Sequence, residues 1–159
     1  MQSKSLLSSL VVTRDSFAPT ALRLALGLMI LPHGLQKTLG WFGGYGFKGS
    51  MDYLTGTIGA PWIFALLAIL AESVGGLMLI AGLGTRLAAL GVGGVMLVAT
   101  TQHWANGFFM NWYGNQKGEG VEFHLLALGI VAALLMLGGG RLSVDSLVGR
   151  GNAALARDS

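Results

Sequence analysis

The feature that most constrains this chain is the segment 21–40, which has the length of a membrane-spanning helix but is not uniformly apolar. Its polar side chains are Arg23, His33, Gln36 and Lys37. In hydrocarbon each of these groups is costly unless it faces protein or a water-filled cavity. We therefore expect other helices to cover the polar face of this segment.

The composition is that of a membrane protein. Of the 159 residues, 53% are hydrophobic and 11% are charged, whereas soluble domains average roughly 25% charged residues. The chain has no cysteine, which excludes disulfides, thiolate metal ligands and cysteine-held iron–sulfur clusters. The net charge of +3 is small and its basic residues are dispersed, so we expect no nucleic-acid partner.

The hydropathy pattern predicts an all-α fold, an integral membrane four-helix transmembrane bundle. The expected spans are residues 19–39, 61–83, 87–104 and 121–137, within a domain 18–147 that lies between tails 1–17 and 148–159. The connections 40–60 and 105–120 are rich in glycine and aromatic residues. Five glycines in the first ten residues of the earlier connection argue against a regular helix there.

Basic residues predict the orientation of the four spans. With four spans both termini lie on one side, and seven of the ten Lys and Arg residues fall on that side. The positive-inside rule then places both termini in the cytoplasm. Small-residue pairs predict close helix packing: Ala71 with Gly75, Ala89 with Gly93, and Gly129 with Ala133.

Aromatic and histidine residues gather in the opposite, outer half. All four Trp and all three Tyr lie in or beside the two connections, and all three His fall in the same half. An aromatic belt at the membrane surface would explain several of these residues, but a belt normally forms at both surfaces. The alternative is an outward-facing pocket lined by rings, and we weigh the two equally.

Two polar groups involve the first span. Arg23 and Glu72 could form a buried pair that fixes helix register, or Glu72 could carry a proton. His33 and Lys37 are four residues apart, and Arg23 lies on the same side of the helix, so this cationic face should point into the bundle. Lys37 could instead extend to the outer membrane surface.

A third group comprises His103, Glu122 and His124. Because Glu122 and His124 are two residues apart on a helix, only one of them would face His103 directly. Histidine and carboxylate together can bind zinc, iron or copper, but no H-x-x-x-H or E-x-x-H spacing supports a metal, so we name no metal ligand. A proton relay or a hydrogen-bonding set for a carbonyl-bearing ligand fits these residue types as well.

Three motifs resemble the DoxX family of small bacterial membrane proteins: RLALGLMILPHGLQK in the first span, AESVGG and AGLGTRLAAL around the second turn, and GGGRLSVDSL after the fourth span. The resemblance covers about residues 20–147. It implies a four-helix bundle in the bacterial inner membrane and a relationship to a membrane subunit of a thiosulfate:quinone oxidoreductase. The polar positions that match are Arg23, His33, Gln36, Lys37, Glu72, Arg86, Arg141 and Asp145, of which the last three resemble structural charges, with an Arg–Asp clasp among them.

The leading functional hypothesis is a membrane subunit of a quinone-linked oxidoreductase system. The expected catalytic residues are Glu72, Arg23 and His33, and the expected ligand-binding residues are His33, Gln36, Lys37, Trp62, His103, Trp104, Trp112, Glu122 and His124. Quinone is the expected cofactor, and the partners considered are the lipid bilayer, a redox partner protein and a second copy of the chain. The alternatives are a non-catalytic membrane scaffold or assembly subunit, and a small-solute or proton transporter that uses Glu72.

Overall fold

The computed structural model describes residues 13–155, and every regular element in that range is helical. The four longest helices are α2 (Ala18–Leu39), α4 (Trp62–Ala81), α5 (Thr85–His103) and α6 (Glu122–Leu137). Two shorter α-helices are α3 (Gly46–Asp52) and α7 (Val144–Leu155). The all-α prediction is confirmed, and the four long helices lie where the hydropathy pattern predicts them.

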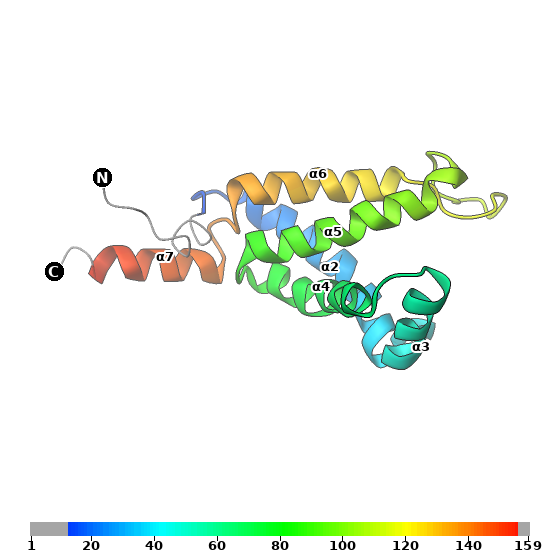
Figure 1. Cartoon of the computed structure of the whole chain (residues 1–159). Coiled ribbons are helices and arrows are strands. Elements are labelled where there is room, and N and C mark those ends of the chain that lie inside the picture. The colour runs from blue at the N-terminus through cyan, green and yellow to red at the C-terminus, as the bar shows by residue number, and fades with distance from the viewer. Residues whose placement is uncertain (1–12, 156–159) are drawn as a thin grey trace.

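Each of the four long helices packs beside the next long helix in the chain (Figure 1). Helix α2 contacts α4 and α6, and α5 contacts α4 and α6. We call the end that holds the start of α2, the end of α4 and the start of α7 the terminal end. The opposite end, with α3 and the α5–α6 connection, is the loop end; these two segments lie on different sides of it (Figure 1).

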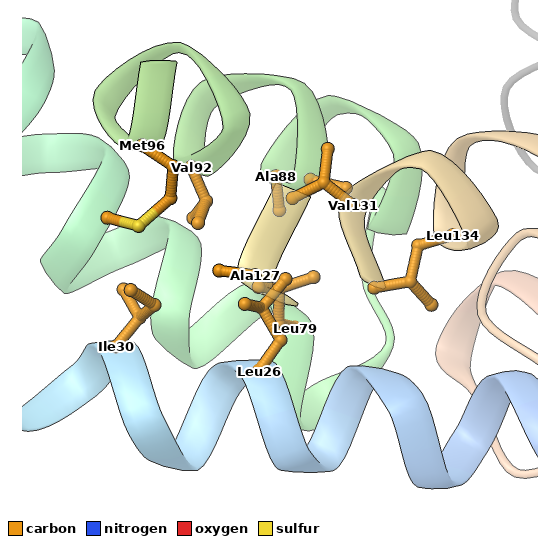
Figure 2. Close-up of a cluster of buried hydrophobic side chains, with 10 residues drawn as sticks. Leu26, Ile30, Leu79, Ala88, Val92, Met96, Ala127, Val131 and Leu134 are labelled. Atoms are coloured by element: carbon orange, nitrogen blue, oxygen red, sulfur yellow. The ribbon is translucent and has the colours of Figure 1, made fainter. Parts of the chain in front are cut away.

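The main hydrophobic core lies between all four long helices. Figure 2 shows Leu26 and Ile30 of α2 pointing toward side chains of the other three helices. The core residues are Leu26, Ile30, Leu79, Ala88, Ala89, Val92, Met96, Ala127, Val131 and Leu134. A second, smaller cluster of Met51, Ala65 and Ile69 joins α3 to α4.

Glycines end the first two long helices. Gly40 follows α2 with φ 73°, and Gly82 follows α4 with φ 70°, both in the left-handed region that glycine adopts without steric penalty. Pro32 lies inside α2 without ending the helix. The tight turn after α4 places α5 directly beside it.

The closest helix packing occurs between α2 and α4. A Cβ added to Gly34 would lie 2.5 Å from the backbone of Ser73, and one added to Gly27 would lie 3.0 Å from the carbonyl oxygen of Gly76. The predicted small-residue pairs are only partly used: Gly93 meets Val131 of α6, whereas Gly129 faces open space. Glycine is therefore required where α2 meets α4, at positions outside those pairs.

The prediction that the first connection lacks regular helix is wrong at α3. Gly46 takes a left-handed φ of 66° at the first position of this helix, and Gly49 has the ring-bearing Tyr45 against it. Ser50 and Met51 are buried, and Met51 packs into the cluster with α4. Tertiary packing therefore overrides the low helix propensity of glycine.

Within residues 13–155, two helices are both long and apolar enough to cross a membrane. These are α2 and α4, whose most apolar 18-residue windows have mean hydropathies of 1.2 and 2.3. Helix α6 is apolar but has only 16 residues. That all four long helices cross a membrane stays a prediction.

Candidate functional site

A half-buried ion pair joins α2 to α4. The ammonium of Lys37 donates to the Glu72 carboxylate, and the two side chains are 28% and 6% exposed. Gly34, one turn before Lys37, lets the two backbones approach closely at this level. Lys37 therefore turns toward α4, and the alternative in which it extends to the surface is not the arrangement found.

The predicted pair between Arg23 and Glu72 is wrong. The Arg23 guanidinium, in a residue only 2% exposed, donates to the carbonyl oxygens of Leu79, Ile80, Gly139 and Leu142. Helices α2 and α4 run antiparallel, so the start of α2 lies beside the end of α4. Glu72 is eight residues before Ile80, which is about 12 Å along a helix.

Asp145 completes the polar network of the terminal end. Its carboxylate, in a residue 2% exposed, accepts hydrogen bonds from the backbone N–H groups of Gly84 (2.7 Å) and Thr85 (2.9 Å). These are unpaired donors at the start of α5, so Asp145 caps that helix from the start of α7. Arg86 donates to the carbonyl of Leu135 at 2.8 Å, and so holds α5 to α6.

Two histidines meet at the loop end. The rings of His103 on α5 and His124 on α6 stack with their centroids 4.9 Å apart and their planes at 23°. His103 Nδ1 lies 3.1 Å from the carbonyl oxygen of Glu119. His124 is 7% exposed, and its Nδ1 is buried with no hydrogen-bond partner among the described residues.

Glu122 has a different role from His124, as their spacing predicts. Its carboxylate accepts from the backbone N–H of Met110 at 3.3 Å and from Trp112 Nε1 at 3.4 Å. Further backbone bonds run from Val121 N–H to the Gly107 carbonyl and from Glu122 N–H to the Phe108 carbonyl. Glu122 therefore holds the α5–α6 connection, while His124 alone faces His103.

Comparison with known proteins adds a family to this geometry. The DoxX family model matches residues 18–112 of the 159. The chain belongs to the DoxX family. No curated protein and no solved structure matches it.

The DoxX match begins with α2 and ends inside the second connection. It therefore includes Lys37, Glu72 and His103, but stops before His124 and Asp145. The resemblance to this family is confirmed, and this DoxX chain is a membrane protein by its family and its apolar helices. The histidine stack and the Asp145 cap therefore each join a residue inside the match to one outside it.

The expectation that His33 points into the bundle is wrong. His33 lies on the exposed side of α2, although Arg23 and Lys37 on the same helix both turn toward α4. Gln36 is half-buried and donates from Nε2 to the carbonyl of Phe42 at 3.4 Å, which ties the first connection to α2. The residues of the predicted cationic face therefore point in two directions, with Arg23 and Lys37 toward α4 and His33 toward the exterior.

The tryptophans predicted to bind a ring compound are surface groups of the single chain. Trp62 is 61% exposed, Trp104 is 67% exposed and Trp112 is 76% exposed. Other exposed rings of the two connections are Trp41, Phe42, Tyr45, Phe47, Tyr53, Phe108, Phe109 and Tyr113. These rings form two groups, one around α3 and one on the α5–α6 connection.

The loop end holds two histidines and two glutamates, which are possible metal ligands. Within residues 13–155, no group of three or more His, Cys, Asp or Glu side chains is close enough to hold a metal ion. Among the ring contacts of the described residues, the stacked imidazoles of His103 and His124 are the pair that brings two possible metal ligands together.

Two features of the site were missed from the sequence, namely the Lys37–Glu72 pair and the capping role of Asp145. The sequence contained the information needed to predict the Lys37–Glu72 pair. In two antiparallel helices joined by one connection, residues late in α2 meet residues early to midway in α4. The second joins residues 60 apart in the chain, and no local pattern marks such a partner.

Proposed function

We propose that this DoxX protein spans the bacterial inner membrane with all four long helices and with both termini in the cytoplasm. Support comes from the mutual packing of the four helices and from the seven basic residues on the terminal side against three on the other. Helices α5 and α6 have 19 and 16 residues, which their aromatic ends can extend to the membrane surface. The domain 18–147 then lies in the bilayer between cytoplasmic tails.

Within that topology, we propose a membrane subunit of a quinone-linked oxidoreductase system. The observation that carries the proposal is the stacked pair of His103 and His124, in which the buried Nδ1 of His124 has no well-formed hydrogen bond within residues 13–155, although the ring also interacts with the Gly120 backbone. Buried polar atoms in proteins are nearly always hydrogen-bonded, and exceptions often mark sites of chemistry. A carbonyl-bearing ring compound fits such a pair together with the exposed tryptophans.

His103 supplies the hydrogen-bonding chemistry. Because a carbonyl oxygen can only accept, Nδ1 of His103 must carry the proton that it donates to Glu119. In the neutral ring Nε2 then has a free lone pair and accepts a hydrogen bond, and in the protonated ring it donates one. Through Nε2, His103 can therefore accept a hydrogen bond from a hydroxyl when neutral and donate one to a carbonyl when protonated.

The remaining polar residues support this site from a distance. A bound quinone would supply the two-electron chemistry, and the protein would hold its ring and exchange its protons. The Lys37–Glu72 pair provides a second buried group able to hold a proton, on α2 and α4. Arg23 donates to backbone carbonyls of α4 and of the segment before α7, so its part is to hold the terminal end together.

The test measures quenching of tryptophan fluorescence by a short-tailed ubiquinone analogue in an uncharged detergent. His103→Ala should weaken binding roughly 5- to 10-fold, because one hydrogen bond to the ring is lost. His33→Ala is the matched control, since His33 is exposed on α2, and it should bind like the unchanged protein. Equal binding by both variants, or no saturable quenching at all, would overturn the proposal.

A scaffold function is the second candidate, and the exposed aromatic rings favour it. Exposed Trp, Tyr and Phe are the side chains enriched at the centres of protein interfaces. This function predicts that Trp112→Ala and Tyr113→Ala abolish co-purification of a partner protein, while His103→Ala leaves it unchanged. Loss of the partner in all three variants would instead connect the partner to the histidine site.

A further inference from the structure

The terminal end has a hollow of about 400 Å³ that the proposed quinone site does not use. It lies between the end of α4 and the segment that leads into α7, which continues beyond the packed helices (Figure 1). Its lining has a cationic and an apolar part. Arg141 and Arg150 form the cationic part, and Ala81, Leu142, Val144 and Leu147 line the apolar part.

The cationic part has more positive than negative charge. Arg141 and Arg150 are 54% and 61% exposed, and both approach the same carboxylate oxygen of Asp15, at 3.7 Å and 3.4 Å. One carboxylate cannot neutralise two guanidiniums, so one positive charge remains. Exposed ion pairs contribute little stability, so an incoming anion can replace Asp15. Arg141 also stacks over the Phe17 ring at 5.3 Å, which holds it in position.

The apolar part continues along α4. Leu70, Val74, Leu77 and Ala81 are all exposed, and their spacing of three or four residues places them on one face of the helix. Ala81, at the end of this stripe, also lines the hollow. Leu142 and Leu147 are 64% and 68% exposed beside the two arginines. An apolar track therefore leads directly to a pair of cations.

We propose that this hollow binds the head of an anionic phospholipid, with its phosphate on Arg141 and Arg150 and an acyl chain along the α4 stripe. Only an amphiphile satisfies both parts of the lining, because a free phosphate has no use for the apolar stripe. Basic side chains at the cytoplasmic membrane surface attract anionic lipids. The inference rests on α4 crossing the membrane and not on quinone binding.

The experiment is native mass spectrometry of the full chain in an uncharged detergent, with dioleoyl-phosphatidylglycerol and dioleoyl-phosphatidylcholine added in equal amounts. The unchanged protein should retain the anionic lipid at least fivefold more than the zwitterionic one, in about one copy per chain. The double variant Arg141→Gln with Arg150→Gln should lose that preference. Lys48→Gln removes an exposed cation at the loop end, where Lys48 pairs with Asp52, and should keep it.

A second variant tests the hollow without changing charge. Ala81→Trp fills the end of the stripe, and it should lower retention of phosphatidylglycerol severalfold even if the arginine variant fails to fold. Inorganic phosphate is the other probe, and it should not displace the lipid at millimolar concentration. An equal loss in Lys48→Gln, displacement by phosphate, or unchanged retention in Ala81→Trp would overturn the proposal.

Discussion

The two ends of this protein differ in how they treat buried ionisable side chains. At the terminal end, Arg23 and Asp145 are each 2% exposed, and their donors and acceptors are directed to backbone groups of neighbouring segments. At the loop end, His124 is also buried but its Nδ1 has no partner among residues 13–155, and the aromatic rings face outward. The terminal end therefore pairs its buried charges, although the hydroxyls of Thr20 and Thr85 there also have no partner among these residues, whereas the loop end leaves a buried imidazole nitrogen without one.

This difference distinguishes polar groups that have a structural role from polar groups that are candidates for a functional role. A buried polar group in an apolar environment is strongly destabilising unless it is paired, so a fully paired group is explained by stability alone. An unpaired group needs another explanation, such as a ligand or a proton. The predicted functional residues therefore fall into a structural group at the terminal end and a candidate functional group at the loop end. Four variants test this division, in order of decreasing expected effect.

Arg23→Met should have the largest effect. It removes the Arg23 donor from the carbonyls of Gly139 and Leu142, and the expected loss is about 3 kcal/mol or more of unfolding free energy. The measurement is unfolding by sodium dodecyl sulfate in mixed micelles. Arg14→Met, at an exposed position, is the control and should stay within about 0.5 kcal/mol. Similar midpoints for both variants would show that the terminal network is not structural.

Gly34→Ala should rank second. The added methyl would meet the α4 backbone at 2.5 Å, so α2 and α4 must separate, at a cost of about 2 kcal/mol. Gly129→Ala makes the same change on α6, where nothing lies within 4 Å, and should be neutral or stabilising by a few tenths of a kcal/mol. Equal effects in the same unfolding assay would contradict the close approach of α2 and α4.

Asp145→Asn should follow. The amide keeps one acceptor but loses the charge that holds the N–H groups of Gly84 and Thr85, so we expect a loss of about 1–2 kcal/mol. Asp15→Asn is the matched control, because Asp15 is 70% exposed and forms only surface ion pairs, which are worth about 0–1 kcal/mol. A larger loss of unfolding free energy in Asp15→Asn than in Asp145→Asn would show that the surface ion pairs, and not the helix cap, stabilise this end.

Glu72→Gln should have the smallest effect on stability, about 1 kcal/mol, because the flexible Lys37 can turn toward water once its partner is lost. Adding Lys37→Met should recover most of that loss, and a double-mutant cycle measures the coupling. The same single variant tests the transporter alternative. If Glu72 carries protons across the membrane, pH-dependent flux in proteoliposomes disappears in Glu72→Gln, and if it does not, flux is unchanged.

Hydropathy was sufficient to predict the long helices. Helices α2 and α6 follow the predicted ranges 19–39 and 121–137 within one residue at either end. The reason is that a long apolar run in this composition has few alternatives to a helix. The spacing of Glu122 and His124 also predicted correctly that only one of them faces His103, because helical geometry fixes that angle.

Contacts between helices were less predictable. The pairing of Lys37 rather than Arg23 with Glu72 depends on the register of two antiparallel helices, which single-helix periodicity does not contain. His33 was expected inside the bundle because a helical wheel shows which residues share a side, but not which side another helix covers. Helices α3 and α7 were not predicted because their glycines and polar residues have low helix propensity. Packing or capping by other parts of the chain supports these helices.

The hydrogen bonds of Arg23 also set an order of events during synthesis. Arg23 emerges from the ribosome early, but two of its acceptors, the carbonyls of Gly139 and Leu142, are made more than a hundred residues later. Until then the guanidinium can reach only the carbonyls of Leu79 and Ile80 on α4. Packing of the first helix is therefore completed late, because the Arg23 guanidinium reaches its full set of hydrogen bonds only after residues 139–142 have been made.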